Sequence, residues 1–283
     1  MRQPLPARFG RYVLLRVLGE GSSAQVFGAQ CPIHGSVAVK ILRPELAGDT
    51  EVATRFLRET TLSMAIEHEA LVPAYDAGTE QGCHFLSNAW MRGGTLLQRL
   101  RLAPLRPAAA LAVADRVLAA LSAIHAAGAV HRDVKPSNVL FDGRGRAYLG
   151  DLGLARFVKE RQLAVTMPGF AIGSPAWMAP EQLRGAGPEP RSDLYAAGAL
   201  LYMCLTGTLP VRGGDTRELL HNLRAGTGPD PEAIAALPSA VRAPLQALLA
   251  PLPEQRPRDA GAARELLRAA RELLPPGPPA EPA

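Results

Sequence analysis

Apolar and polar positions alternate in short runs over the first ninety residues, and these runs predict strands arranged around one helix. The strand-like runs are residues 12–18, 25–29, 36–42, 75–77 and 84–90. Residues 50–67 differ, because apolar residues stand among charges there in a way that suits a helix with one buried side. Those apolar residues are Val52, Phe56, Met64 and Ile66. This part of the chain is therefore expected to be a small β-rich unit with one main helix.

After Gly93 and Gly94 the pattern becomes helical. Residues 107–127 carry apolar side chains at helical spacing, and Gly128 stands where a helix C-cap is expected. Residues 194–211 contain no charged residue and reach the length of a membrane span. Because the last third of that segment reads as a turn, a buried helix of a large helical unit is the better interpretation.

The amino-acid composition limits the possible classes of protein. The 283 residues are 47% hydrophobic, which suits a folded globule long enough for two lobes. The net charge is +5, but the arginines are scattered and aromatic residues make up only 5%, so the chain is not expected to bind nucleic acid. The Pro-rich segment 275–283 has no periodicity and is expected to be disordered.

The cysteines and the first apolar stretch bear on location. Cys31, Cys83 and Cys204 are odd in number and far apart, which favours free thiols in a reducing compartment. Together with His34 and His84 the first two could supply four zinc ligands, but the expected fold places them at opposite ends of a sheet. The apolar stretch 12–18 is too short for a secretory signal. A cytoplasmic location without a membrane partner is expected.

Two motifs in the second half of the chain carry the chemistry. Residues 131–138 read HRDVKPSN, and Asp151-Leu152-Gly153 follows thirteen positions after Asn138. In this arrangement an aspartate accepts the proton of a substrate hydroxyl, while an asparagine and a second aspartate bind Mg²⁺. We therefore expect Asp133 to act as the base, with Lys135 as a neighbouring cation and Asn138 and Asp151 as metal ligands.

A glycine-rich turn and a lysine in the first unit suit the binding of phosphates. Gly19 and Gly21 begin a G-x-G-x-x-A pattern between two strands, where the backbone can approach phosphates closely; a plain hairpin turn is the alternative. Lys40, on the next strand, would hold the α- and β-phosphates. It is one of only three lysines in the chain, with Lys135 and Lys159.

Lys40 requires a carboxylate to fix its position. Glu59, nineteen residues further on in the expected helix, is the best candidate. Glu51 and Glu67, near the ends of that helix, are the alternatives.

An adenine pocket would be formed by four apolar residues. Leu18, Val26 and Ala38 would form its roof and Leu140 its floor, although such residues also occur in ordinary cores. Residues 88–91 would be the hinge, where the backbone of Ala89 and Met91 hydrogen-bonds adenine.

The segment after Asp151 contains the candidate phosphorylation sites. Thr166 and Ser174 are the only hydroxyl residues between Gly153 and Pro175. A phosphate on Thr166 would bind arginine, with Arg132 the expected partner; an unmodified loop threonine is the alternative.

Two acidic residues further along are expected to be structural. Glu181, in Ala179-Pro180-Glu181, is expected to pair with Arg256, and Asp193 is expected to open the buried helix.

Together these motifs resemble those of the eukaryotic-like serine/threonine protein kinases found in bacteria, over residues 10–272. The resemblance implies an α+β, two-lobed fold with ATP in the cleft: an N-lobe at 10–91, a C-lobe at 92–272, and a tail at 273–283. By motif position it implies a Lys40–Glu59 ion pair, Asp133 as base, and ATP and Mg²⁺ as cofactors. Lys135 matches the serine/threonine type.

The chain departs from the family pattern at three positions. Leu152 replaces the usual Phe, Asn88 stands where Met, Thr or Leu is commoner, and Ala89 replaces a frequent Glu. These changes affect the expected nucleotide affinity but leave the chemistry in place.

The expected function is phosphorylation of Ser or Thr in protein substrates, regulated through the activation loop, with self-association for autophosphorylation. One alternative is a pseudokinase that serves as a nucleotide-binding scaffold. Another is a small-molecule kinase, against which the Ala179-Pro180-Glu181 element argues.

Overall fold

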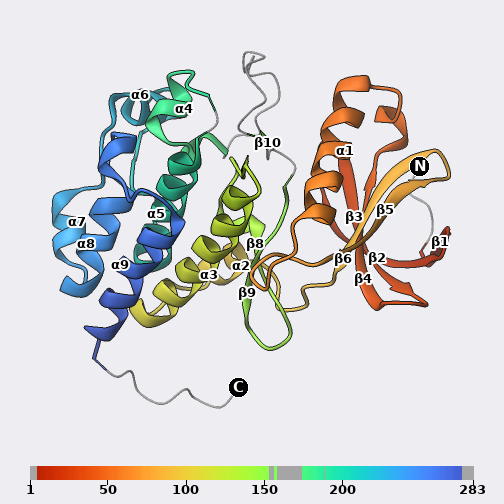
Figure 1. Ribbon diagram of the computed structural model, residues 1–283, viewed down its shortest axis with the longest axis horizontal. Helices are drawn as coiled ribbons and strands as arrows, with labels where there is room; N and C mark the ends of the chain where they lie inside the picture. The colour runs from red at the N-terminus through yellow and green to blue at the C-terminus, as the bar shows by residue number, and fades with distance from the viewer. Residues whose placement is uncertain (1–4, 153–155, 158–173, 188, 276–283) are drawn as a thin grey trace. The chain divides into compact units, whose positions relative to one another are not determined.

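The computed structural model describes residues 5–152, 156–157, 174–187 and 189–275, and the chain divides into two units (Figure 1). The first unit is formed by residues 1–94 together with 140–155. The second is formed by residues 95–139 and 156–283. No pattern in the sequence predicts that residues 140–155 group with the first ninety-four.

The first unit is built on an antiparallel sheet with the strand order β1-β2-β3-β4-β6-β5. Its strands are β1 (Ala7–Phe9), β2 (Tyr12–Glu20), β3 (Ala24–Cys31), β4 (Gly35–Leu42), β5 (Ala74–Glu80) and β6 (Cys83–Ala89). Five of these six were predicted from alternation, and β1, only three residues long, was not. A second small sheet pairs β8 (Val139–Phe141) with β9 (Ala147–Leu149).

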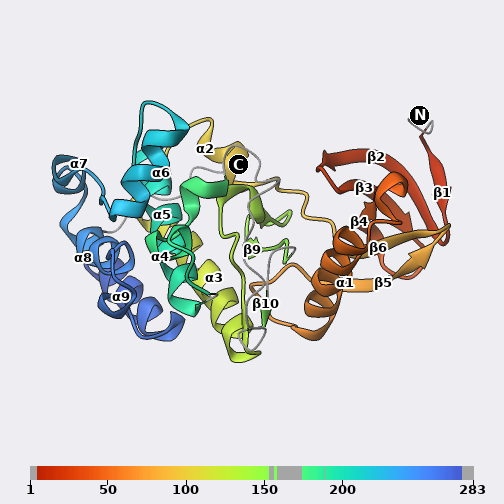
Figure 2. The same ribbon diagram turned by 90° about the horizontal axis from the view of Figure 1, so that it is seen from above.

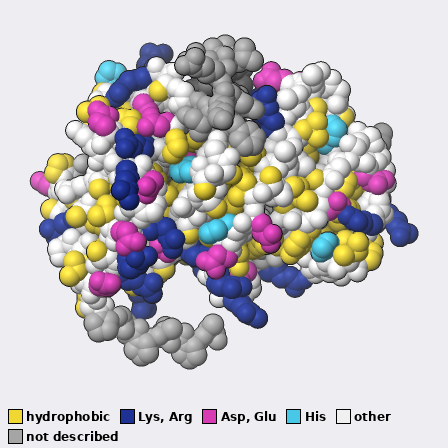
Figure 3. All heavy atoms as spheres, viewed as in Figure 1, with side chains coloured by type: hydrophobic (Ala, Val, Ile, Leu, Met, Phe, Trp, Pro, Cys, Tyr) yellow, Lys and Arg dark blue, Asp and Glu magenta, His cyan; other side chains and the backbone are white. Residues whose placement is uncertain are grey.

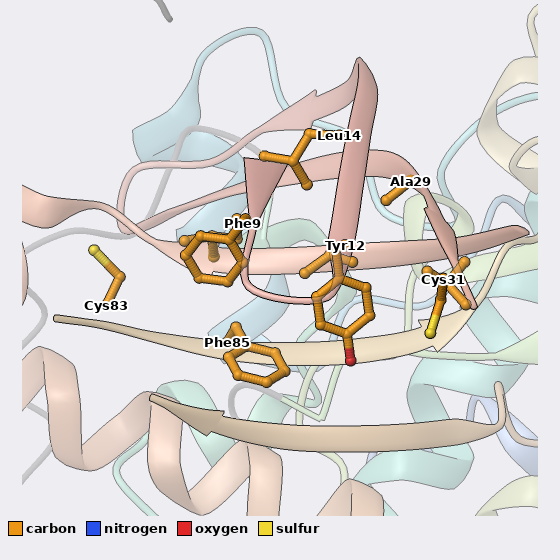
Figure 4. Packing of buried hydrophobic residues seen from close by; sticks show 10 residues of the cluster. Phe9, Tyr12, Leu14, Ala29, Cys31, Cys83 and Phe85 are labelled. Atoms are coloured by element: carbon orange, nitrogen blue, oxygen red, sulfur yellow. The ribbon is translucent and has the colours of Figure 1, made fainter. Parts of the chain in front are cut away.

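The two faces of β4 differ because successive side chains of a strand point to opposite sides. Val37, Val39 and Ile41 are buried in a cluster to which β1, β2, β3 and β6 also contribute. In that cluster the Phe85 ring meets Phe9 edge-on at 5.7 Å between ring centroids (Figure 4). The alternate residues, among them Lys40, therefore lie on the opposite face of the sheet.

Helix α1 (Thr50–Ala65) lies along that opposite face (Figures 1 and 2). Asp49 caps its first turn by accepting hydrogen bonds from two backbone N–H groups. The buried side carries Phe56, Glu59 and Leu62. The expectation that Met64 belongs to this side is wrong, since Met64 is 47% exposed. It follows Leu62 by two residues, which is about 200° around a helix.

The second unit is mostly helical, which together with the first confirms the α+β class. Helix α3 (Pro107–Ala126) packs against α5 (Pro190–Thr206) and α9 (Ala260–Glu272). The remaining helices are α2 (Leu96–Leu100), α4 (Pro180–Leu183), α6 (Thr216–Ala225), α7 (Pro231–Ala235) and α8 (Ser239–Leu248). Short strands β7 (Ala129–Val130) and β10 (Arg156–Phe157) pair with each other.

Helix α5 is the buried helix predicted for residues 194–211. It is buried over most of its length and ends at Gly207, whose φ of 74° closes the helix in the left-handed region. Gly198 lets α8 approach closely, because a Cβ there would lie 2.7 Å from the Leu248 Cβ. Within the described ranges only α3 is long and apolar enough to span a membrane. Its packing against α5 and α9 accounts for that apolar character.

Charges on the molecular surface are mixed. On the face shown in Figure 3, Lys and Arg side chains are interspersed with Asp and Glu side chains. Arg264, for example, pairs with Asp115, and Arg146 with Asp142.

Candidate active site

In the first unit, Lys40 lies between two carboxylates. Its Nζ is 2.6 Å from Glu59 Oε1 and 3.1 Å from Asp151 Oδ1. The sheet and α1 fix this arrangement, since Lys40 projects from β4 toward the buried side of the helix. Among the carboxylates considered for Lys40, Glu59 is thus the partner that the structure provides. Glu51 instead binds Arg55 at 3.0 Å on the exposed side of α1.

Burial and charge act against each other in this group. Burial raises the pKa of the Glu59 carboxyl to about 7, although the nearby Lys40 ammonium opposes the shift. Burial alone would lower the pKa of Lys40, but the carboxylates of Asp151 and Glu59 outweigh it and raise that pKa. The Asp151 side chain is 45% exposed, so its oxygens suit a further cation such as Mg²⁺.

The residues predicted for nucleotide binding lie in the same unit. Val26 is registered opposite Lys40, and Ala38 is registered opposite Asn88, so they share the face that carries the lysine. Both are partly exposed, whereas Val37 and Val39 are fully buried. Apolar side chains left partly exposed on one face are suited to contact a flat apolar ligand.

Two other predicted pocket residues lie in β2 and β8 of the same unit. Leu18, near the end of β2, is 37% exposed. Leu140 lies in β8 and is partly buried, with its Cδ1 3.0 Å from where a Cβ on Gly150 would lie.

The predicted glycine-rich segment is a tight hairpin turn between β2 and β3. Gly21 N–H donates to Ala24 O at 2.8 Å, which closes the turn. A Cβ at Gly19 would meet nothing within 4 Å, so the backbone is open on that side. The Gly21 carbonyl accepts from both Nε and Nη2 of Arg43 at 3.1 Å. Nothing in the sequence predicts that Arg43 anchors this turn.

The expected hinge follows β6. Ala89 N–H donates to Pro73 O at 2.9 Å, so this N–H is already used within the unit. A role of Ala89 toward adenine therefore depends on its carbonyl, and Met91 follows two residues later.

In the second unit, the residues of the HRDVKPSN run form a compact group. Lys135 Nζ lies 2.6 Å from Asp133 Oδ2. Asn138 Nδ2 donates to the same carboxylate oxygen at 2.9 Å and to the Asp133 backbone carbonyl at 2.8 Å. These contacts hold the carboxylate of Asp133, which is only 9% exposed, in one orientation. A fixed, charged acceptor of this kind is suited to take a proton from a hydroxyl.

A buried aspartate holds the backbone of this loop. Asp193, in the first turn of α5, accepts hydrogen bonds from the backbone N–H groups of His131 and Arg132, each at 2.8 Å. Its Oδ2 also lies 2.8 Å from His125 Nε2. Arg132 has a φ of 68°, a conformation that is strained for a residue with a Cβ. Asp193 therefore stabilises a strained loop, a role beyond the helix-opening one expected from the sequence.

The predicted pair of Glu181 and Arg256 is present in the second unit. Arg256 binds Glu181 through two hydrogen bonds of 2.6 and 2.8 Å, and Ser192 Oγ donates to the same carboxylate at 2.7 Å. Burial tends to raise the pKa of Glu181, but the bonds from Arg256 and Ser192 lower it below its ordinary value. Of the phosphorylation candidates, Thr166 lies outside the described residues. Ser174 begins a short helical turn, but its side chain also lies outside them.

Comparison with known families matches residues 12–269 to the protein kinase domain, and the chain therefore belongs to the protein kinase family. It is 39% identical over 271 residues to the DNA damage-responsive serine/threonine-protein kinase RqkA of Deinococcus radiodurans, covering 94% of this chain and 40% of that protein. It is 35% identical over 269 residues to the serine/threonine-protein kinase PknH of Mycobacterium tuberculosis, covering 94% and 42%. For PrkC of Bacillus subtilis the identity is 35% over 221 residues, covering 77% and 34%.

These relatives confirm the predicted family, the bacterial serine/threonine kinases of eukaryotic type. The chain spans between 34% and 42% of the three relatives' lengths.

Proposed function

We propose that this chain transfers the γ-phosphoryl group of ATP to Ser or Thr hydroxyls of protein substrates. The observation that supports this most strongly is the pair of Lys40 and the buried Glu59, at 2.6 Å, in a chain that belongs to the protein kinase family. A partly exposed lysine fixed by a buried carboxylate is typical of a site that orients phosphates. Catalysis here is mostly positioning and electrostatic stabilisation.

Each charged residue then has a defined task. Lys40, held by Glu59, binds the α- and β-phosphates. Asp133 accepts the proton of the attacking hydroxyl, and Lys135 at 2.6 Å from its carboxylate stabilises negative charge as the phosphoryl group moves. Within each unit these contacts hold the charged side chains in place, so each pair requires little reorganisation during the reaction.

The metal ligands in this proposal are Asn138 and Asp151. Both offer oxygen atoms, which Mg²⁺ prefers, and the 45% exposure of the Asp151 side chain supports a cation there. When bound, Mg²⁺ would neutralise charge on the phosphates. Lys40 itself keeps its proton in this setting, because the neighbouring carboxylates raise its pKa.

The adenine site in this proposal uses the partly exposed apolar face and the segment after β6. Its members are Leu18, Gly19, Gly21, Val26, Ala38, Lys40, Ala89, Met91 and Leu140. All belong to the first unit, which supports residues 10–91 as part of the nucleotide-binding lobe. The catalytic and substrate-docking lobe is proposed at 92–272, although residues 140–155 of that range group with the first unit.

Regulation is proposed through the segment after Asp151. Phosphorylation of Thr166 or Ser174, in a reaction between two copies of the chain, would order that segment through arginine contacts. The protein would act in the cytoplasm, within signal transduction.

The decisive experiment is incubation of the purified protein with Mg²⁺ and γ-labelled ATP, beside an Asp133→Asn variant, followed by mapping of phosphate by mass spectrometry. Label on Ser or Thr in the wild type alone is the expected result. Equal labelling of both proteins would contradict the assignment of Asp133. Nucleotide binding with no transfer to any protein would favour the pseudokinase scaffold.

A further inference from the structure

Trp90 and Gly28 fit together in a way that the site described above does not use. Gly28 lies inside β3 without the positive φ that would call for glycine. A Cβ added there would lie 2.7 Å from Cη2 of Trp90 and 3.0 Å from Cζ2 and Cζ3. Glycine is therefore required at this position for space, because the indole of Trp90 lies directly on the strand.

The position of Gly28 connects this contact to the proposed nucleotide site. In the sheet, Gly28 is registered opposite Ala38 on one side and Arg16 on the other. Paired residues point to the same face, so Trp90 lies against Gly28 on the face that carries Ala38 and Lys40. Trp90 itself belongs to the segment after β6 that would contact adenine.

Two arginines lie over the same ring. The guanidinium carbon of Arg16 is 4.9 Å from the Trp90 ring centroid, and that of Arg92 is 5.1 Å away. Arg92 also donates to Ser36 Oγ at 2.7 Å. Each arginine is attracted by the electron-rich face of the indole.

The local irregularity of β2 makes the Arg16 contact possible. Leu14 is buried in the core and would normally point to the same face as Arg16, two residues later. The register shifts between these two residues, so that Leu14 pairs with Ala29 and Arg16 with Gly28. The bulge thus turns Arg16 to the face on which Trp90 lies.

We propose that Trp90 is a positioning residue for the nucleotide, which holds the hairpin of β2 and β3 at a fixed distance from the hinge segment. The proposal rests on the proposed kinase function. The hairpin carries Gly19 and Gly21, and the hinge segment carries Ala89 and Met91. The indole ring of Trp90 therefore connects the two segments that line the proposed adenine pocket. Gly28, Arg16 and Arg92 are the groups that hold that ring.

The first test compares Trp90→Ala with the wild type in steady-state kinetics. Loss of the ring and of two cation–π contacts is expected to raise KM for ATP about tenfold while kcat changes by less than about twofold. KM for the protein substrate should stay unchanged. Arg16→Met should give a smaller rise in KM for ATP, and Arg16→Lys, which keeps the cation, should restore most of the loss. A wild-type KM for ATP in Trp90→Ala would overturn the proposal.

A double-mutant cycle separates the role of the ring from that of the strand. Gly28→Ala forces the indole off β3 and is expected to raise KM for ATP about as much as Trp90→Ala. In the Trp90→Ala background, Gly28→Ala meets no ring and should cause no further change. An equal effect of Gly28→Ala in both backgrounds would show that the strand alone is responsible, and would overturn the proposal.

A binding measurement keeps this inference distinct from the proposed activity. The shift in melting temperature caused by ADP and Mg²⁺ reports nucleotide affinity without turnover. It should be reduced in Trp90→Ala and in Gly28→Ala, while the melting temperatures without nucleotide show that both variants fold. If the wild type binds ADP but transfers no phosphate, only the proposed activity fails. If all variants bind ADP like the wild type, the role of Trp90 fails.

Discussion

At the scale of single residues, the Glu59 carboxyl is the group of the proposed site whose pKa lies near neutrality. With a pKa of about 7, it is mostly neutral below that pH and ionised above it. Only the ionised form attracts the Lys40 ammonium by charge, so kcat/KM for ATP is expected to rise about tenfold between pH 6 and pH 8. Glu59→Gln should show a low kcat/KM for ATP that does not rise between pH 6 and pH 8. Glu51→Gln, which removes only an exposed contact with Arg55, should keep the wild-type profile.

Substitution of Asp193 is expected to lower both stability and kcat. It accepts from the backbone N–H groups of His131 and Arg132, and an amide in its place would turn one acceptor oxygen into a donor. Asp193→Asn is expected to cost about 1–3 kcal/mol of unfolding free energy. It should also lower kcat more than a hundredfold, since the Asp133 loop is no longer held. Urea unfolding and single-turnover transfer measure the two effects, and an unchanged kcat would count against this role.

Among the secondary-structure elements, the turn between β8 and β9 depends on one carboxylate. Asp142 accepts from the backbone N–H groups of Arg144 and Arg146 at 2.9 Å and pairs with the Arg146 side chain. Burial tends to raise the pKa of Asp142, but these hydrogen bonds outweigh it and lower the pKa to about 2. A lowered folded-state pKa means that this contribution is present above about pH 4 and is lost as the pH falls toward 2.

Because the Arg146 side chain is 60% exposed, solvent screens the pair and keeps this contribution small. The difference in unfolding free energy between wild type and Asp142→Asn should therefore shrink from pH 6 to pH 2.5. A difference that is independent of pH would exclude this account of the turn.

The close packing of helices α5 and α8 at Gly198 gives a second prediction at this scale. Gly198→Ala improves intrinsic helix propensity, yet its Cβ would lie 2.7 Å from the Leu248 Cβ. We expect a net loss of about 1–3 kcal/mol from overpacking. Thermal unfolding should show that Gly198→Ala is less harmful when Leu248 is also changed to Gly. If Gly198→Ala alone raises the melting temperature, the two helices can move apart without a loss of stability, and the expected overpacking is wrong.

Much of the architecture could be predicted at the level of elements, but unevenly. Strands of seven to nine residues and the long helices show clear periodicity, and so β4, α1 and α3 were expected near their observed bounds. β1, β8 and β9 have only three residues each, too few to show a period. At the site, charge and spacing predicted the partner of Lys40. The bond from Asp193 to a loop more than sixty residues earlier depends on tertiary structure, which no local pattern encodes.

At the scale of the whole molecule, the first unit is discontinuous in sequence. Residues 140–155 complete it, although residues 95–139 of the second unit precede them in the chain. β9 is bonded to the segment before β5, through Leu149 N–H to Ala70 O at 2.8 Å and Val72 N–H to Leu149 O at 2.9 Å. Phe141 exchanges two further backbone bonds with Gly93 and Gly94. Without residues 140–155 these groups lose their partners, and Lys40 loses one of its carboxylates.

A fragment of residues 1–94 is therefore expected to be poorly folded, with rapid amide hydrogen exchange in β4 and β6. Joining residues 140–152 to it through a short Gly-Ser linker should restore slow exchange, because Phe141 N lies 2.9 Å from Gly94 O and the ends to be joined are adjacent. A linked segment with its sequence scrambled is the control. If the fragment alone exchanges as slowly as the linked form, residues 140–152 do not stabilise the first unit, and the sheet with α1 is sufficient to place Lys40 beside Glu59.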